Sequence, residues 1–89
     1  MTDNTATDTT YIDVEELRAT VAEVLDVDSA EVTEDARYIE DLGVDSLLAL
    51  EMQLAFEQVY GIELTEAEMR QAKSLRMTHE LLNRKCSAK

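Results

Sequence analysis

The chain has few aromatic residues and a single cysteine. Its 89 residues include three Tyr, one Phe and no Trp, so aliphatic side chains must fill the core, a composition that favours helices. The lone Cys86 excludes an internal disulfide and a cysteine-based zinc cluster, and we expect it to be a spare thiol. No apolar run resembles a transmembrane span, and residues 1–4 lack the features of a signal peptide. These absences predict a cytoplasmic protein.

Basic residues are missing from the middle of the chain. The formal net charge is −12, and no Lys or Arg lies between Arg37 and Arg70, where Asp and Glu are frequent. A surface of this sign repels nucleic-acid phosphates and anionic membranes. We therefore expect basic protein partners, and binding to neither nucleic acid nor membrane.

Apolar residues recur at helical spacing in two long segments, one that follows Asp13 and one over residues 46–59. Asp45 has the position of an N-cap for the second helix, and Gly61 that of its C-terminal stop. Between the two segments, residues 26–44 are polar and acidic with scattered apolar positions. This stretch predicts a long loop anchored to the core.

Two shorter patterns complete the chain. Thr65 and Glu68 have the spacing of a capping box, which predicts a short third helix, and Ser74 can cap a last helix. With no convincing strand, the predicted fold class is an all-α four-helix bundle with a long loop between the first two helices and a short third helix. We expect three parts: a flexible leader over 1–10, one domain over 11–84 and a flexible tail over 85–89.

Ser46 is the candidate for covalent chemistry. It lies in the first turn of the second helix, where backbone N–H groups without helical partners favour a phosphate, although Asp45 and Ser46 could also serve only as caps. A catalytic serine would need a base, and the only imidazole, His79, is expected at the surface of the last helix. Without a nucleophile elbow, a serine hydrolase ranks low. We assign no catalytic residue and no metal site, and expect another enzyme to modify Ser46.

The second helix carries two apolar stripes. The wider stripe is the predicted core face and contains Leu48, Met52, Ala55, Phe56 and Val59. The narrower one contains Leu47, Leu50 and Leu54 and lies beside Glu51 and Glu57. Because a small domain rarely buries both, the narrow stripe is predicted to dock basic partners with an apolar groove. The alternative is that the third or fourth helix covers it.

The segment Asp41-Leu42-Gly43-Val44-Asp45-Ser46-Leu47 resembles the phosphopantetheine attachment motif of acyl carrier proteins, and the similarity extends from about residue 14 to residue 82. The resemblance implies that a transferase, which needs magnesium, moves a 4′-phosphopantetheine arm from coenzyme A to Ser46. The thiol of the arm then carries acyl groups as thioesters, and the protein is no enzyme. Asp45 would take part in transferase recognition. The implied partner-docking residues are Leu47, Leu50, Glu51, Leu54 and Glu57.

Some residues depart from the commonest family pattern. Thr65 stands where many relatives have Pro, and Leu48 replaces a residue that is often polar in fatty-acid carriers. These features point to a discrete carrier of a polyketide or mixed peptide–polyketide pathway. The alternatives are a carrier of primary fatty acid synthesis, an aminoacyl or peptidyl carrier and, from another class, a non-covalent acidic helical adaptor.

The implied partners of such a carrier are a phosphopantetheinyl transferase and acyltransferase, ketosynthase or loading enzymes with basic docking surfaces. The chain itself is expected to be a monomer. The sequence identifies neither the cargo nor whether the bundle shelters it, since the reactive thiol belongs to the cofactor.

Overall fold

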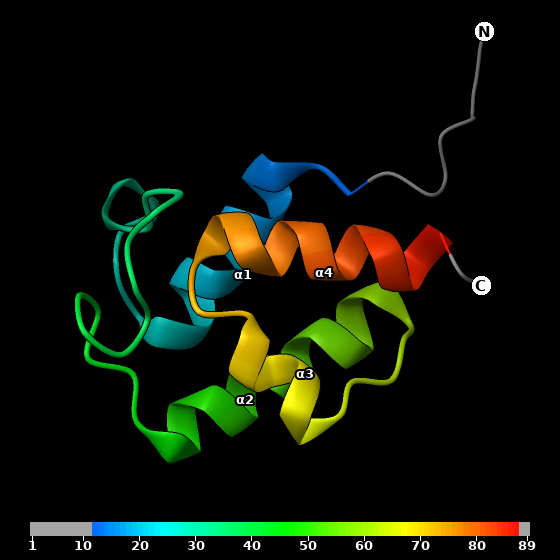
Figure 1. Cartoon of the computed structure of the whole chain (residues 1–89). Helices are drawn as coiled ribbons and strands as arrows, with labels where there is room; N and C mark the ends of the chain where they lie inside the picture. Colours follow the sequence, from blue (N-terminus) through cyan, green and yellow to red (C-terminus); the bar gives the residue numbers. More distant parts are fainter. Residues whose placement is uncertain (1–11, 88–89) are drawn as a thin grey trace, which may run out of the picture.

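The computed structural model describes residues 12–87 as a bundle of α-helices (Figure 1). The elements are α1 (Val14–Leu25), the 3₁₀ turn η2 (Ser29–Glu31), α2 (Ser46–Tyr60), α3 (Glu66–Gln71) and α4 (Leu75–Ser87). Within these residues the only β-type pairing is an isolated bridge between Arg37 and Ser74. The predicted all-α fold with four helices and a short third one is confirmed. The leader expected over 1–10 lies outside the described residues.

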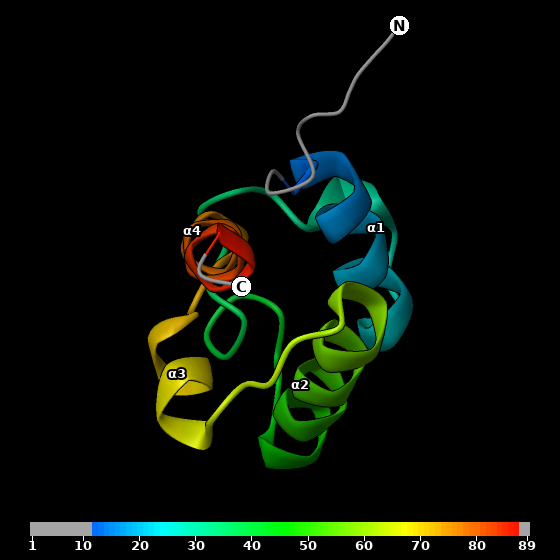
Figure 2. The ribbon, with the colours of Figure 1, turned by 90° about the vertical axis from the view of Figure 1, so that its right-hand side faces the viewer.

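The helices form two pairs. Figure 2 views α4 end-on and shows α1 and α2 together on one side of the molecule, with α3 and α4 on the other. The long connection between α1 and α2 lies at one end of the bundle, beside the start of α4 (Figure 1). In the described part of the chain, no helix has the length and apolar character needed to cross a membrane.

Caps set the helix boundaries. The Asp45 carboxylate accepts a 2.9 Å hydrogen bond from the backbone N–H of Leu48, and α2 ends at Gly61 in the left-handed conformation. Thr65 and Glu68 form the complete capping box at the start of α3. These three boundaries were predicted because the residues that set them are neighbours in sequence.

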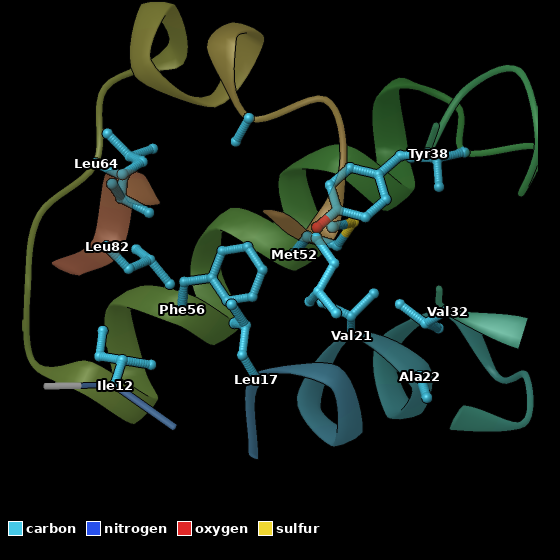
Figure 3. Close-up of a cluster of buried hydrophobic side chains, with 14 of the residues drawn as sticks. Ile12, Leu17, Val21, Ala22, Val32, Tyr38, Met52, Phe56, Leu64 and Leu82 are labelled. Carbon is cyan, nitrogen blue, oxygen red and sulfur yellow. The ribbon is translucent and has the colours of Figure 1, made fainter. Parts of the chain in front are cut away.

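The core is built mainly where α2 meets α1. Figure 3 shows Phe56 and Met52 of α2 facing Leu17 and Val21 of α1, and all four side chains are fully or almost fully buried. The prediction that Val59 belongs to this core is wrong, because its side chain is 58% exposed.

The buried face of α2 follows the row of residues four apart, which passes from Met52 through Phe56 to the partly buried Tyr60. Val59 lies beside that row, and the last turn of α2 therefore turns it towards solvent.

The long connection between α1 and α2 is anchored along its length. Arg18 of α1 donates to the backbone carbonyl of Val32 at 2.8 Å, and Val32 itself is buried. Arg76 of α4 binds both carboxylate oxygens of Asp35, at 2.8 and 3.2 Å, and pairs with Glu34 at 3.1 Å. The predicted loop is therefore held against both α1 and α4.

The C-terminal helix continues beyond the expected domain boundary at Arg84. Lys85, in the last turns of α4, binds both carboxylate oxygens of Glu68 at 3.1 and 2.9 Å, and Cys86 packs half-buried against the core. Contacts with α3 and with the core therefore stabilise residues 85–87 as helix, where a flexible tail was expected.

His79 is half-buried, whereas we expected it at the surface. Its Nε2 lies 2.6 Å from the backbone carbonyl oxygen of Ile12 and 3.3 Å from Nδ2 of Asn83. The backbone N–H of Ile12 donates to the side-chain oxygen of Asn83 at 2.9 Å. His79 and Asn83 thus fasten the segment before α1 onto α4.

Candidate functional site

The segment before Ser46 begins with a tight turn. The backbone N–H of Asp41 donates to the Arg37 carbonyl, and the Asp41 carboxylate accepts from the Arg37 N–H, both at 2.8 Å. Gly43 follows with a φ of +70°, and a Cβ built there would meet no heavy atom within 4 Å. The glycine is therefore required by the backbone conformation and not by lack of space.

Val44 fixes the end of this segment to the bundle. Its side chain is buried, and its N–H donates to the carbonyl of Tyr38 at 2.9 Å. The backbone N–H of Tyr38 in turn donates to the backbone carbonyl of Lys73 at 3.0 Å, and the Tyr38 hydroxyl lies 2.7 Å from Oγ1 of Thr78 in α4. The residue two positions before Ser46 is therefore tied, through Tyr38, to α4.

Ser46 is exposed at the first position of α2. Asp45 precedes it as the N-cap, and the carbonyl of Asp45 accepts the N–H of Ala49 at 2.9 Å. The unpaired N–H groups of the first turn and the helix dipole give this end of α2 a partial positive charge. An anionic group on the Ser46 oxygen would lie next to that charge.

The narrow stripe of α2 is exposed. Leu47, Leu50 and Leu54 expose 63%, 49% and 48% of their surface, and we call these three residues the leucine ridge. Glu51 is exposed on the same helix. The alternative that α3 or α4 covers this stripe is thereby removed.

The side chain of Glu57 binds the backbone of the connection between α2 and α3, a contact that the sequence did not reveal. Its Oε2 accepts the backbone N–H of Leu64 at 2.8 Å, while Nε2 of Gln53, one turn earlier, donates to the carbonyl of Leu64 at 2.7 Å. Leu64 is buried. Gln53 and Glu57 therefore clamp the connection between α2 and α3, so Glu57 has a structural role whether or not it also contacts a partner.

A cavity of about 900 Å³ opens beside Ser46. Its walls come from the segment before α2, from α2 and from α3 with the residues that follow it, and its lining includes Ser46, Leu50 and Met69. Three basic residues, Arg37, Arg70 and Lys73, also line it. The lining contains no histidine, and His79 instead contacts Ile12, so this cavity provides no imidazole to activate Ser46. Within residues 12–87, no cluster of side chains suited to a metal ion forms.

Comparison with known proteins places these features in a family. Residues 15–82 match the family described as "Phosphopantetheine attachment site". The chain is also 54% identical over 79 residues to polyketide-8 synthase acyl carrier protein 2 of Streptomyces avermitilis, covering 89% of this chain and 91% of that protein. The chain belongs to the acyl carrier protein family.

Two further relatives are acyl carrier proteins of Helicobacter pylori, strains G27 and HPAG1. Each is 41% identical to this chain over 54 residues, which cover 61% of this chain and 69% of the relative. The carrier role predicted from the sequence is therefore supported. Acyl carrier proteins are carriers and not catalysts, and the family implies interaction with synthase enzymes and with a phosphopantetheinyl transferase.

The prosthetic group expected for an acyl carrier protein is covalent 4′-phosphopantetheine. The residues present fit that group, because an exposed hydroxyl stands at a positive helix end where a phosphodiester would be favoured. When attached, the group supplies a thiol that holds acyl chains as thioesters. The exposed hydroxyl of Ser46, its fixed position and the surfaces around it are what this chain would contribute.

Proposed function

We propose that Ser46 is the attachment residue of this carrier and that the chain catalyses no reaction itself. The observation that carries the proposal is the exposed hydroxyl at the first position of α2, held from behind by buried Val44 and capped by Asp45. A residue presented in this way is accessible to a modifying enzyme. The absence of an imidazole from the cavity lining supports the same proposal.

The leucine ridge and Glu51 form the proposed docking surface for partner enzymes. Fully burying a leucine side chain contributes about 1.5–3 kcal/mol, so three half-exposed leucines beside Ser46 can supply much of the affinity of a transient complex. The carboxylate of Glu51 would attract a basic partner and orient it. The partners proposed are a phosphopantetheinyl transferase and acyltransferase, ketosynthase or loading enzymes.

The pathway proposed is polyketide synthesis. The support is the similarity over nearly the full chain to a protein named as a polyketide synthase carrier, whereas the similarity to the Helicobacter proteins covers a shorter segment. A cytoplasmic location and a monomeric state stay predictions from the sequence.

Incubation with coenzyme A, magnesium and a phosphopantetheinyl transferase tests the attachment. Intact-mass measurement should show the addition of one arm to the wild type and none to Ser46→Ala. Ser29→Ala is the matched control, because Ser29 is also exposed but lies in η2, and it should gain the arm normally. An arm added to Ser46→Ala would reject Ser46 as the attachment residue.

The docking surface is tested separately with the loaded protein. Leu50→Ala and Glu51→Lys should weaken binding to a partner ketosynthase, measured by titration calorimetry, while exposed Val59→Ala at the far end of α2 should not. Equal affinities for all of these variants would reject the proposed surface and leave the attachment intact.

A further inference from the structure

Ile39 is the most exposed large apolar side chain in the described part of the chain. It exposes 71% of its surface, more than any residue of the leucine ridge. Single apolar residues at a protein surface are common and by themselves indicate nothing. The position of Ile39 relative to Ser46 is what distinguishes it.

Ile39 lies near the proposed attachment residue, although the two belong to different segments. It directly follows Tyr38, whose backbone carbonyl accepts the N–H of Val44 at 2.9 Å, and Val44 stands shortly before Ser46. Ile39 and Ser46 also line the same cavity. Leu50 of the leucine ridge lines it too, so the surroundings of Ser46 receive apolar surface from α2 and from the connection before it.

The turn that carries Ile39 has an ordered backbone. The N–H groups of Asp41 and Leu42 donate to the carbonyl of Arg37 at 2.8 and 3.1 Å, and the side chain of the preceding Tyr38 is buried. Contact of Ile39 with a partner would therefore cost little backbone entropy. Its β-branched side chain also has few rotamers to lose.

Exposed carboxylates accompany this apolar side chain. Glu40 and Asp41 are both exposed close to Ile39 in the sequence. Glu40 lies 3.8 Å from Arg37 and still exposes 68% of its side chain, so its carboxylate is accessible to a second cation. A partner surface that fits here combines an apolar patch with basic residues.

The partner enzymes of a carrier differ in how closely they must approach Ser46. A phosphopantetheinyl transferase joins the Ser46 oxygen to the phosphorus of the arm, with the nucleotide part of coenzyme A as leaving group, so its active site must lie against this residue and its surroundings. Enzymes that act on the loaded carrier react at the far end of the arm. They can therefore dock without covering Ile39.

We propose that Ile39 is a specificity residue for loading: its side chain is buried against the phosphopantetheinyl transferase during transfer of the arm, and it is not needed by enzymes that act on the loaded carrier. The proposal rests on attachment of the arm to Ser46. It distinguishes a contact used only in loading from the leucine ridge, which is proposed for partners of both kinds.

The kinetics of arm transfer to variants of the full chain test this contact. Intact-mass measurement over time gives the KM and kcat of the transferase for each variant. Ile39→Ala should raise KM by about tenfold, which corresponds to the loss of roughly two buried methylene groups. The value of kcat should not change, because Ile39 touches the transferase and not the reacting atoms.

Two further variants show whether the effect belongs to this apolar contact. Ile39→Leu keeps the apolar volume and should retain the wild-type KM. Val59→Ala is the matched control, because Val59 is also β-branched and is 58% exposed, but lies at the far end of α2. It should leave KM and kcat unchanged. Urea unfolding should show equal stability of all three variants and the wild type, since both replaced side chains are exposed.

The second measurement uses the loaded proteins and a partner ketosynthase. Titration calorimetry should give Ile39→Ala the affinity of the wild type. An unchanged transferase KM in Ile39→Ala would overturn the proposal, and so would an equal loss towards the transferase and the ketosynthase.

The site of the added mass separates this proposal from the attachment itself. A wild type that gains no arm, or gains it at a residue other than Ser46, would refute the attachment. Modification of Ser46 in the wild type and in Ile39→Ala with the same KM would refute only the role of Ile39.

Discussion

Substitution of Tyr38 by Phe tests how the segment before Ser46 is held. Thr78 Oγ1 donates its hydrogen to the carbonyl of Ser74 at 2.8 Å, so the 2.7 Å contact with Tyr38 requires the tyrosine to be the donor. Tyr38 is buried. Losing this hydrogen bond should lower the free energy of unfolding by about 1 kcal/mol at neutral pH.

The ionisation of Tyr38 also predicts how the stability of the protein changes at alkaline pH. Burial raises the pKa of Tyr38 from 10.0 to about 12. Between these values the unfolded chain has lost the phenolic proton while the folded chain keeps it, so the wild type loses stability as the pH rises. The full loss amounts to about 2–3 kcal/mol.

Urea unfolding followed by circular dichroism from neutral pH to about pH 11.5 measures both effects. Tyr38→Phe should be less stable than the wild type at neutral pH, and the difference should shrink above about pH 10 and reverse near about pH 11. The difference between the two proteins cancels other titrating groups, including Tyr60, whose pKa is also raised by burial. Equal stability at neutral pH, or parallel curves in alkali, would refute the reasoning.

Three further substitutions have defined outcomes. Gly43→Ala should lower the free energy of unfolding in urea by about 1 kcal/mol, because the residue has a φ of +70°. Asp45→Ala should lower the free energy of unfolding by about 1 kcal/mol, because it removes the acceptor for the backbone N–H of Leu48. Asp45→Asn should keep this cap and slow only the transfer of the arm, which intact-mass measurement over time would follow. The hydrogen bond from the backbone N–H of Thr65 lowers the pKa of the Glu68 carboxyl from its ordinary value of 4.5, so the folded state loses stability as the pH falls below that value. In a pH titration followed by circular dichroism, Glu68→Gln should therefore unfold less steeply in acid than the wild type.

These three results could also contradict the account. Unchanged stability of Gly43→Ala would show that the turn before Ser46 adapts to a side chain. Equal destabilisation by Asp45→Ala and Asp45→Asn would show that the carboxylate charge, and not the cap, matters for folding. If Glu68→Gln unfolds in acid as the wild type does, protonation of Glu68 does not contribute to the loss of stability at low pH.

The features that the sequence predicted are local. The cap at Asp45, the stop at Gly61 and the capping box at Thr65 depend on residues within a few positions of one another, so the chain itself specifies them. The exposure of the leucine ridge was also predictable, because a helix with apolar residues on two sides can bury only one of them in a domain of this size.

The features that the sequence did not predict depend on distant partners. Tyr38 meets Thr78 across 40 positions, Lys85 meets Glu68 across 17, and Glu57 meets the backbone of Leu64 across a turn of irregular chain. The cavity beside Ser46 arises only when three separate segments pack together. No periodicity in the sequence reports such contacts, and the helical conformation of residues 85–87 was missed for the same reason.

Fragment-ion mapping of the loaded wild-type protein tests the central claim most directly. After reaction with coenzyme A, magnesium and the transferase, the added mass should be found on the hydroxyl of Ser46 alone. Finding the arm on another serine, or finding an unmodified Ser46 in protein that has gained the mass, would contradict the account.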